Sequence, residues 1–135
     1  YPDDVPPGCH IPQMRVEVLL EKAADQFPNH PAIHFYSTTW TYRELLARTR
    51  QVAGNLQKLG IKPGDRIVVV LPNSPEYVVL WFAAQYCGAE VVPGNPLYPG
   101  RDVAELIRRT DAKMLIGLDV RLEPCTDALQ EVSVD

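Results

Sequence analysis

The chain has 135 residues, of which 46% are hydrophobic and 22% are charged, close to the averages for globular proteins. This composition excludes a wholly disordered or fibrous chain, and the length suits about one domain. Thirteen Lys and Arg residues against 17 Asp and Glu residues give a net charge of −4 without a basic run, which excludes nucleic acid as a partner. The longest apolar run, residues 77–84, is far shorter than the roughly 20 residues of a membrane-spanning helix.

The first 13 residues contain four of the 13 prolines and are expected to form an extended arm. We assign residues 14–135 to one α/β unit, because no repeat or linker divides them. The arm has neither the basic start nor the apolar core of a signal peptide, so a cytoplasmic location is expected. Three widely spaced cysteines, Cys9, Cys87 and Cys125, agree with reduced thiols.

The sequence pattern in the first half of this unit predicts a helix, a hairpin and a second helix. Apolar residues recur at helical spacing over residues 14–27, and Pro28 ends the pattern. Residues 32–36 and 38–40 are typical of a short β-hairpin. Thr41 and Glu44 form the T-x-x-E capping box of a helix that ends at Gly60, and residues 62–65 fit a type II turn.

The second half alternates strands with helices. Residues 66–71 form a continuous apolar run of the kind found in a central parallel strand, covered on both faces. Ser74 and Pro75 are a typical helix start, and that helix is expected to end at Gly88. The pattern then predicts, in order, a strand at 91–92, a helix at 102–110 and a strand at 114–116. We therefore predict a layered α/β fold with a mostly parallel sheet flanked by helices.

The last segment, residues 124–135, is expected to start a further helix and strand. The sequence stops there without a clear terminal cap. We therefore expect the α/β unit to be truncated.

One nucleotide-binding motif is absent, and two segments resemble a phosphate loop or a nucleophile elbow without meeting its requirements. No G-x-G-x-x-G fingerprint follows any predicted strand, which argues against a dinucleotide-dependent oxidoreductase. Residues 94–102 imitate a phosphate loop, but the glycine spacing is too long and Arg-Asp stands in place of Lys-Ser/Thr. Ser74 lies between a strand and a helix but lacks the flanking glycines of a nucleophile elbow, so helix capping is the better interpretation.

The histidines and aromatic residues are interpreted as structural. Neither His30 nor His34 completes a metal site with Cys9 and His10, so no metal ligand is predicted in the sequence. No carboxylate or nucleophile lies at a sequence spacing from His34 that would indicate a catalytic pair. The aromatic residues at helix or strand spacing are expected in the core; they are Trp40, Trp81, Phe82 and Tyr86.

Ligands of open parallel sheets bind beyond the carboxyl ends of the strands. We therefore expect any ligand contacts at Asn73, Ser74, Asn95 and the loop of residues 119–121. The same helix start at Ser74 could hold an anion through its backbone N–H groups. No group of residues forms a catalytic constellation, and no catalytic residue is predicted.

Four blocks in this order resemble the N-terminal part of adenylate-forming enzymes, with acyl-CoA synthetases as the nearest branch. The blocks are residues 40–45 (WTYREL), 59–67 (LGIKPGDRI), 71–76 (LPNSPE) and 88–98 (GAEVVPGNPLY). The resemblance runs from about residue 14 to residue 117, and its Asn-Pro-Leu-Tyr ending is most similar to long-chain fatty acid–CoA ligases.

The resemblance implies a two-step ligase. A carboxylate attacks the α-phosphate of Mg-ATP and releases pyrophosphate, and CoA then displaces AMP to form a thioester. The phosphate loop, the nucleotide-binding motifs and the C-terminal domain with its lysine would all follow Asp135. This chain is thus expected to be inactive alone. The same resemblance makes Arg121 a candidate contact for a CoA phosphate. A cytoplasmic parent enzyme is expected, and a peripheral association with the membrane is left open.

Two hypotheses follow. The chain is either the N-terminal part of a fatty acid–CoA ligase, with the remaining polypeptide and a carboxylate substrate as partners, or a natural binding or assembly module without ligase activity. A fragment would leave sheet edges and apolar faces uncovered, so self-association is expected.

Overall fold

A three-stranded parallel sheet lies at the centre of the computed structural model, which describes residues 13–118. The apolar run predicted as a central strand forms β3 (Arg66–Val70), with β4 (Glu90–Pro93) on one side and β5 (Met114–Gly117) on the other. Both neighbours are parallel to β3. The predicted α/β fold with a parallel sheet is confirmed.

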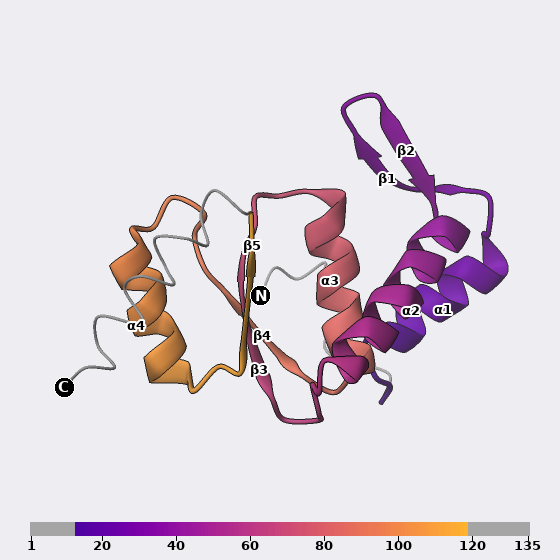
Figure 1. The fold of residues 1–135 in the computed structure, drawn as a ribbon. Helices are drawn as coiled ribbons and strands as arrows, with labels where there is room; N and C mark the ends of the chain where they lie inside the picture. Colours follow the sequence, from indigo (N-terminus) through magenta and orange to yellow (C-terminus); the bar gives the residue numbers. More distant parts are fainter. Residues whose placement is uncertain (1–12, 119–135) are drawn as a thin grey trace, which may run out of the picture.

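Alternate residues of β3 point to opposite faces of the sheet, and both faces are covered by helices (Figure 1). Ile67 and Val69 pack against residues of α2 (Tyr42–Lys58) and α3 (Pro75–Tyr86). Val68 and Val70 pack against Val103 of α4 (Gly100–Thr110). These four β3 residues are at most 3% exposed, which explains why the strand has no polar alternation.

Both central helices begin at the caps that the sequence predicts. The Thr41 hydroxyl accepts a hydrogen bond from the Glu44 backbone N–H at 3.3 Å, and the Glu44 carboxylate accepts one from the Thr41 N–H at 2.8 Å. The Ser74 hydroxyl accepts from the Tyr77 N–H at 3.3 Å, with Pro75 as the first residue of α3. Each cap satisfies backbone donors that have no partner inside the helix.

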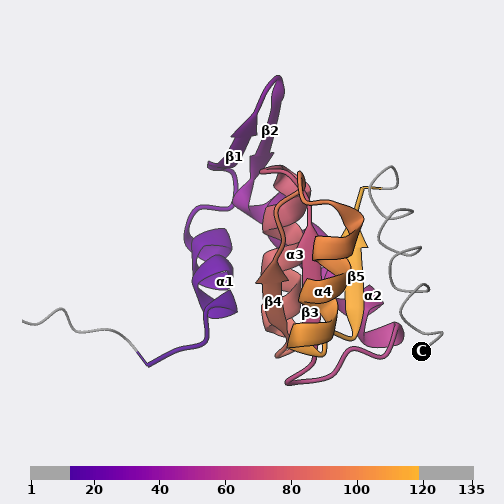
Figure 2. The ribbon, with the colours of Figure 1, turned by 90° about the vertical axis from the view of Figure 1, so that its left-hand side faces the viewer.

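The first helix and the hairpin lie beyond α2 and α3, away from the sheet. Helix α1 (Glu17–Gln26) is followed by β1 (Pro31–Phe35) and β2 (Thr38–Thr41), which pair antiparallel. The hairpin projects from the body of the fold (Figure 2). A third apolar cluster, centred on Leu20, Leu45 and Val79, joins α1 and the base of the hairpin to α2 and α3.

Tight turns connect the layers, and one of them needs glycine for two reasons. Gly88 follows α3 with a φ of +66°, and a Cβ atom there would lie 3.1 Å from the Pro63 Cβ. The opposing turn, residues 62–65, has Gly64 at φ +85° and a hydrogen bond from the Asp65 N–H to the Lys62 carbonyl, as a type II turn requires. The two turns also share a hydrogen bond from the Gly64 N–H to the Gly88 carbonyl.

The structure corrects some predicted boundaries. Helix α1 starts at Glu17, three residues after the predicted start, and Val16 before it offers no side-chain cap. Helix α4 starts at Gly100, two residues earlier than predicted, because the Pro99 carbonyl already accepts hydrogen bonds from the Asp102 and Val103 N–H groups. The proline-rich arm up to residue 12 and the expected elements at 124–135 lie outside the described residues.

Candidate functional site

The carboxyl ends of the three parallel strands place the expected ligand-contact residues at one edge of the sheet. The loop of residues 71–74 leaves β3 there, and the loop that begins at Gly94 leaves β4. The two loops start close together, because the Gly94 N–H donates to the Val69 carbonyl at 2.8 Å and a Cβ on Gly94 would lie 3.0 Å from Val70 Cγ2. The structure thus brings the segments carrying Asn73 and Asn95 to the same edge.

The side chains at this edge have local structural partners. Ser74 caps α3, as predicted, and no described hydrogen bond links its hydroxyl to a general base. The Asn95 Oδ1 accepts from the Leu97 N–H at 2.9 Å, and the Asn95 carbonyl accepts from the Tyr98 N–H at 3.0 Å. Asn95 therefore shapes the turn after β4. Asn73 is exposed, and the predicted contact Arg121 lies outside the described residues with the rest of the 119–121 loop.

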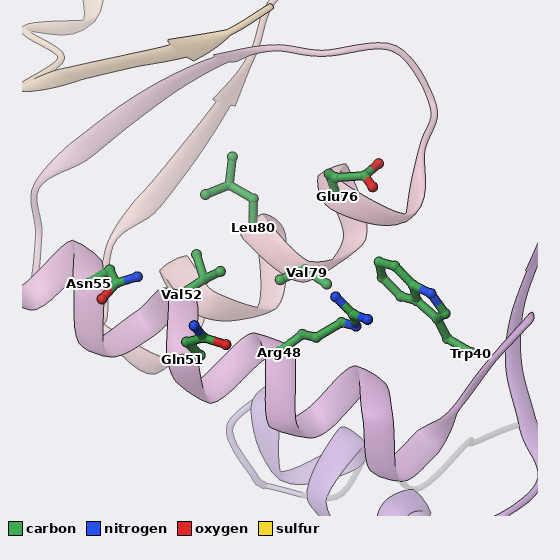
Figure 3. Close-up of a pocket in the computed structure, with 8 residues that line it drawn as sticks. All are labelled: Trp40, Arg48, Gln51, Val52, Asn55, Glu76, Val79 and Leu80. Carbon is green, nitrogen blue, oxygen red and sulfur yellow. The ribbon is translucent and has the colours of Figure 1, made fainter. Parts of the chain in front are cut away.

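A pocket of about 260 Å³ lies between α2 and α3 (Figure 3). Its floor is apolar, with Val52, Val79 and Leu80, while Gln51 and Asn55 lie along α2. At the end nearest the hairpin, the Arg48 guanidinium carbon lies 4.4 Å from the centre of the Trp40 ring, a cation–π contact. The pocket contains polar side chains but no nucleophile paired with a base.

The sequence pattern did not indicate this pocket, because aromatic residues at helix or strand spacing are typical of a core. All four are only half-buried: Trp40 lines the pocket, Phe82 and Tyr86 lie at the margins of apolar clusters, and Trp81 contacts Phe82 edge to face. The prediction that these four side chains are buried in the core was therefore wrong. Arg48 lies two turns after the Thr41 cap, so the Trp–Arg spacing is the signal that could have indicated the contact.

A polar cluster joins helices α1, α2 and α3. The Glu21 Oε1 of α1 accepts hydrogen bonds from the Tyr86 hydroxyl of α3 at 2.7 Å and from Arg50 Nη2 of α2 at 3.1 Å. The hydrogen bond from Tyr86, followed by that from Arg50, lowers the pKa of Glu21. Burial and the bond to Glu21 raise the pKa of Tyr86 to about 12. These partners satisfy one another, so the cluster positions helices and has no free acid or base.

The histidine and cysteine predictions can be compared with the described residues. His34 Nδ1 and Thr39 Oγ1 are hydrogen-bonded at 2.8 Å across the hairpin, which agrees with a structural role. Cys87 is a free, buried thiol whose pKa is raised by burial. Within residues 13–118, no three His, Cys, Asp or Glu side chains converge as they would around a metal ion. In the same range, no helix is long and apolar enough to cross a membrane.

The described part of the chain is therefore a parallel α/β scaffold that carries loops at one sheet edge and contains no catalytic constellation of its own. A sequence model of the family described as AMP-binding enzyme matches residues 20–135. Because this match covers most of the chain, the chain belongs to that family. It is an N-terminal part of the adenylate-forming fold, as the four sequence blocks predict.

Individual relatives and a solved structure agree with this family. A long-chain-fatty-acid–CoA ligase of Bacillus subtilis is 32% identical over 89% of this chain and 21% of its own length. A 4-coumarate–CoA ligase of Humulus lupulus is 42% identical over 83% of this chain and 21% of its own length. The structure of a benzoate CoA ligase from Burkholderia xenovorans superimposes with a TM-score of 0.80 at 25% identity, covering 87% of this chain and 24% of that one. The chain thus spans about a fifth of the length of these curated relatives.

Proposed function

We propose that this chain is the N-terminal part of an ATP-dependent ligase that joins a carboxylic acid to CoA, with a long-chain fatty acid as the acid. The observation that carries the proposal is the match of residues 20–135 to the AMP-binding enzyme family, together with relatives named as acid–CoA ligases. The fatty-acid substrate is supported by the Bacillus relative and by the Asn-Pro-Leu-Tyr segment at residues 95–98.

The proposed reaction has two steps. The substrate carboxylate attacks the α-phosphorus of ATP, and pyrophosphate leaves to give the acyl-adenylate. The CoA thiol then attacks the acyl carbon, losing its proton, and AMP leaves as the thioester forms. Preorganised positive charge stabilises the phosphoryl and acyl transfers in chemistry of this type.

The described residues contribute a scaffold to this reaction. The parallel sheet, the Ser74 cap and the Asn95 turn fix the loops at its carboxyl edge. Among residues 13–118, no three His, Cys, Asp or Glu side chains converge on one point. From the resemblance to adenylate-forming enzymes, we propose that ATP, magnesium and the reacting groups bind to polypeptide beyond residue 135, and we retain Arg121 as a proposed contact for a CoA phosphate. We propose that the chain alone is inactive and that the whole protein is cytoplasmic.

One observation favours a different carboxylic acid as the substrate. The Humulus relative, named for 4-coumarate, has a higher identity than the Bacillus relative named for long-chain fatty acids. An aromatic acid is therefore the alternative substrate within the same reaction class.

The test is thioester formation by the whole protein with hexadecanoate, 4-coumarate and benzoate under identical conditions. We expect kcat/KM for hexadecanoate to exceed that for the aromatic acids by roughly tenfold or more, the scale of about 1.4 kcal/mol in transition-state binding. A preference for 4-coumarate would overturn the fatty-acid assignment while keeping the ligase. No thioester from any acid would overturn the ligase and favour a binding or assembly module.

A further inference from the structure

The pocket between α2 and α3, which we call the α2–α3 pocket, carries two opposite charges beside an apolar floor. Val52, Val79 and Leu80 form the floor. Arg48 of α2 and Glu76 in the first turn of α3 lie on opposite walls at the end nearest the hairpin (Figure 3). An apolar pocket with a few polar groups is the usual form of a binding site for a small molecule.

Neither of these charged side chains is part of an ion pair in the described part of the chain. No ion pair or hydrogen bond within residues 13–118 involves the side chain of Arg48 or Glu76, although both line one pocket. Glu44, one turn before Arg48 on α2, is occupied in the capping box, where it accepts hydrogen bonds from the N–H and the hydroxyl of Thr41. The pocket therefore offers the Arg48 guanidinium and the Glu76 carboxylate to a ligand.

Trp40 sets the position of the Arg48 side chain. The guanidinium carbon lies 4.4 Å from the centre of the Trp40 ring, so the indole covers one face of the guanidinium. The N–H donors of a guanidinium lie in its plane, and stacking on one face leaves them available along the edge. Arg48 is thus held in a position to bind a carboxylate, with aromatic surface beside it.

The two charges specify the ligand. A simple carboxylate bound to Arg48 would bring a second negative charge near Glu76, and a simple amine bound to Glu76 would bring a second positive charge near Arg48. A molecule with a carboxylate and an ammonium group on the same carbon matches both charges at once. A peptide carries only one of these groups at each terminus, so the match requires a free amino acid.

We propose that the α2–α3 pocket binds a free α-amino acid with an apolar side chain. The ligand's carboxylate pairs with Arg48, its ammonium group pairs with Glu76, and its side chain packs on the apolar floor. The volume of about 260 Å³ lies just below the roughly 300–1,000 Å³ that is typical of pockets for drug-sized ligands, which suits a molecule of this size. The inference goes beyond the proposed function, because neither the acid nor the nucleotide of the ligase reaction is assigned to this pocket.

The test is equilibrium dialysis of labelled L-phenylalanine against the 135-residue chain and against the whole protein, at concentrations where light scattering verifies monomers. Saturable binding is expected in both. Arg48→Gln and Glu76→Gln should each weaken it by at least roughly tenfold, because each removes a charge-assisted hydrogen bond. Both side chains are exposed, so these variants are expected to keep the fold, which circular dichroism verifies.

Arg43→Gln is the matched control, because Arg43 is exposed on the same helix and does not line the pocket. This variant should bind L-phenylalanine as tightly as the wild type does. Binding that Arg48→Gln leaves unchanged would overturn the proposal, because the ligand would then lie elsewhere. Absence of saturable binding in the 135-residue chain or in the whole protein would overturn it as well.

Two analogues of L-phenylalanine test the match of charges directly. Hydrocinnamate lacks the ammonium group and phenethylamine lacks the carboxylate, and each is used as a competitor of labelled L-phenylalanine. Both should compete at least roughly tenfold more weakly than unlabelled L-phenylalanine. Hydrocinnamate that competes as well as L-phenylalanine would overturn the amino-acid assignment in favour of a simple carboxylate, and equally effective phenethylamine would overturn it in favour of a simple amine.

Discussion

The Tyr86 hydroxyl of α3 donates a 2.7 Å hydrogen bond to the Glu21 carboxylate of α1, across 65 residues of sequence. Because Arg50 of α2 donates to the same carboxylate oxygen, one acceptor holds three helices together. These two hydrogen bonds tie α1 to both α2 and α3.

This relationship predicts a pH-dependent contribution to stability at alkaline pH. The folded state raises the pKa of Tyr86 from 10.0 to about 12, so the contribution is complete below pH 10 and is lost as the pH rises towards 12. Tyr86→Phe should cost about 1 kcal/mol near neutral pH, since Glu21 is only partly shielded from water. The measurement is urea unfolding of both proteins from pH 7 to pH 12.

The difference between wild type and Tyr86→Phe should shrink as the pH rises from 10 to 12. A constant difference over that range would contradict the raised pKa of Tyr86, whose largest cause is burial. At acid pH the sign is opposite for Glu21: its lowered pKa gives a contribution that is present above about pH 4.5 and lost below it, and Glu21→Gln should remove that loss.

The glycine after α3 gives a second prediction. Gly88→Ala should destabilise the fold by about 1–2 kcal/mol, because the new side chain would occupy the left-handed region and press against Pro63. Gly54→Ala is the matched control: Gly54 lies inside α2, no atom lies within 4 Å of the position that its new methyl group would take, and its substitution should stabilise by about 0.5–1 kcal/mol. Thermal unfolding of both variants checks this, and effects of the same sign would refute the argument.

The assignment of Ser74 as a helix cap is also testable. Ser74→Ala should cost about 1 kcal/mol of stability, whereas Ser74→Asp should retain most of it because a carboxylate also caps a helix. In the whole protein, Ser74→Asp should keep most of the ligase activity. Loss of activity in Ser74→Asp at wild-type stability would show instead that the hydroxyl takes part in chemistry.

The isolated chain is predicted to self-associate. It exposes the apolar side chains Leu19, Leu97 and Leu118, and exposed apolar surface promotes association. Light scattering across the micromolar range should show a mass that rises with concentration. A single monomeric species throughout that range would contradict this prediction.

The parts of the fold that the sequence could predict are those that depend on interactions between residues close together in the chain. The Thr41–Glu44 capping box, the Ser74–Pro75 start and the apolar run of β3 each depend on neighbouring residues, and each is confirmed. The start of α1 was predicted less well because Val16 offers no capping side chain.

The candidate site was less accessible to sequence reasoning, because its contacts join distant segments. The sequence identified Asn73 and Asn95 as loop residues, but the turn that occupies the Asn95 side chain depends on backbone geometry. The burial of Trp40 and Phe82 depends on which surfaces of α1, α2 and α3 meet. Hydrophobicity predicted that these side chains avoid water, yet it could not distinguish a core position from an uncovered interface.

The central claim is that these residues belong to an enzyme that activates a carboxylic acid with ATP. Acid-dependent exchange of pyrophosphate into ATP measures the first step alone and needs no CoA. The whole protein should catalyse this exchange when hexadecanoate is added, and the 135-residue chain should not. Absence of exchange in the folded whole protein with fatty and aromatic acids alike, or exchange by the 135-residue chain alone, would contradict the account.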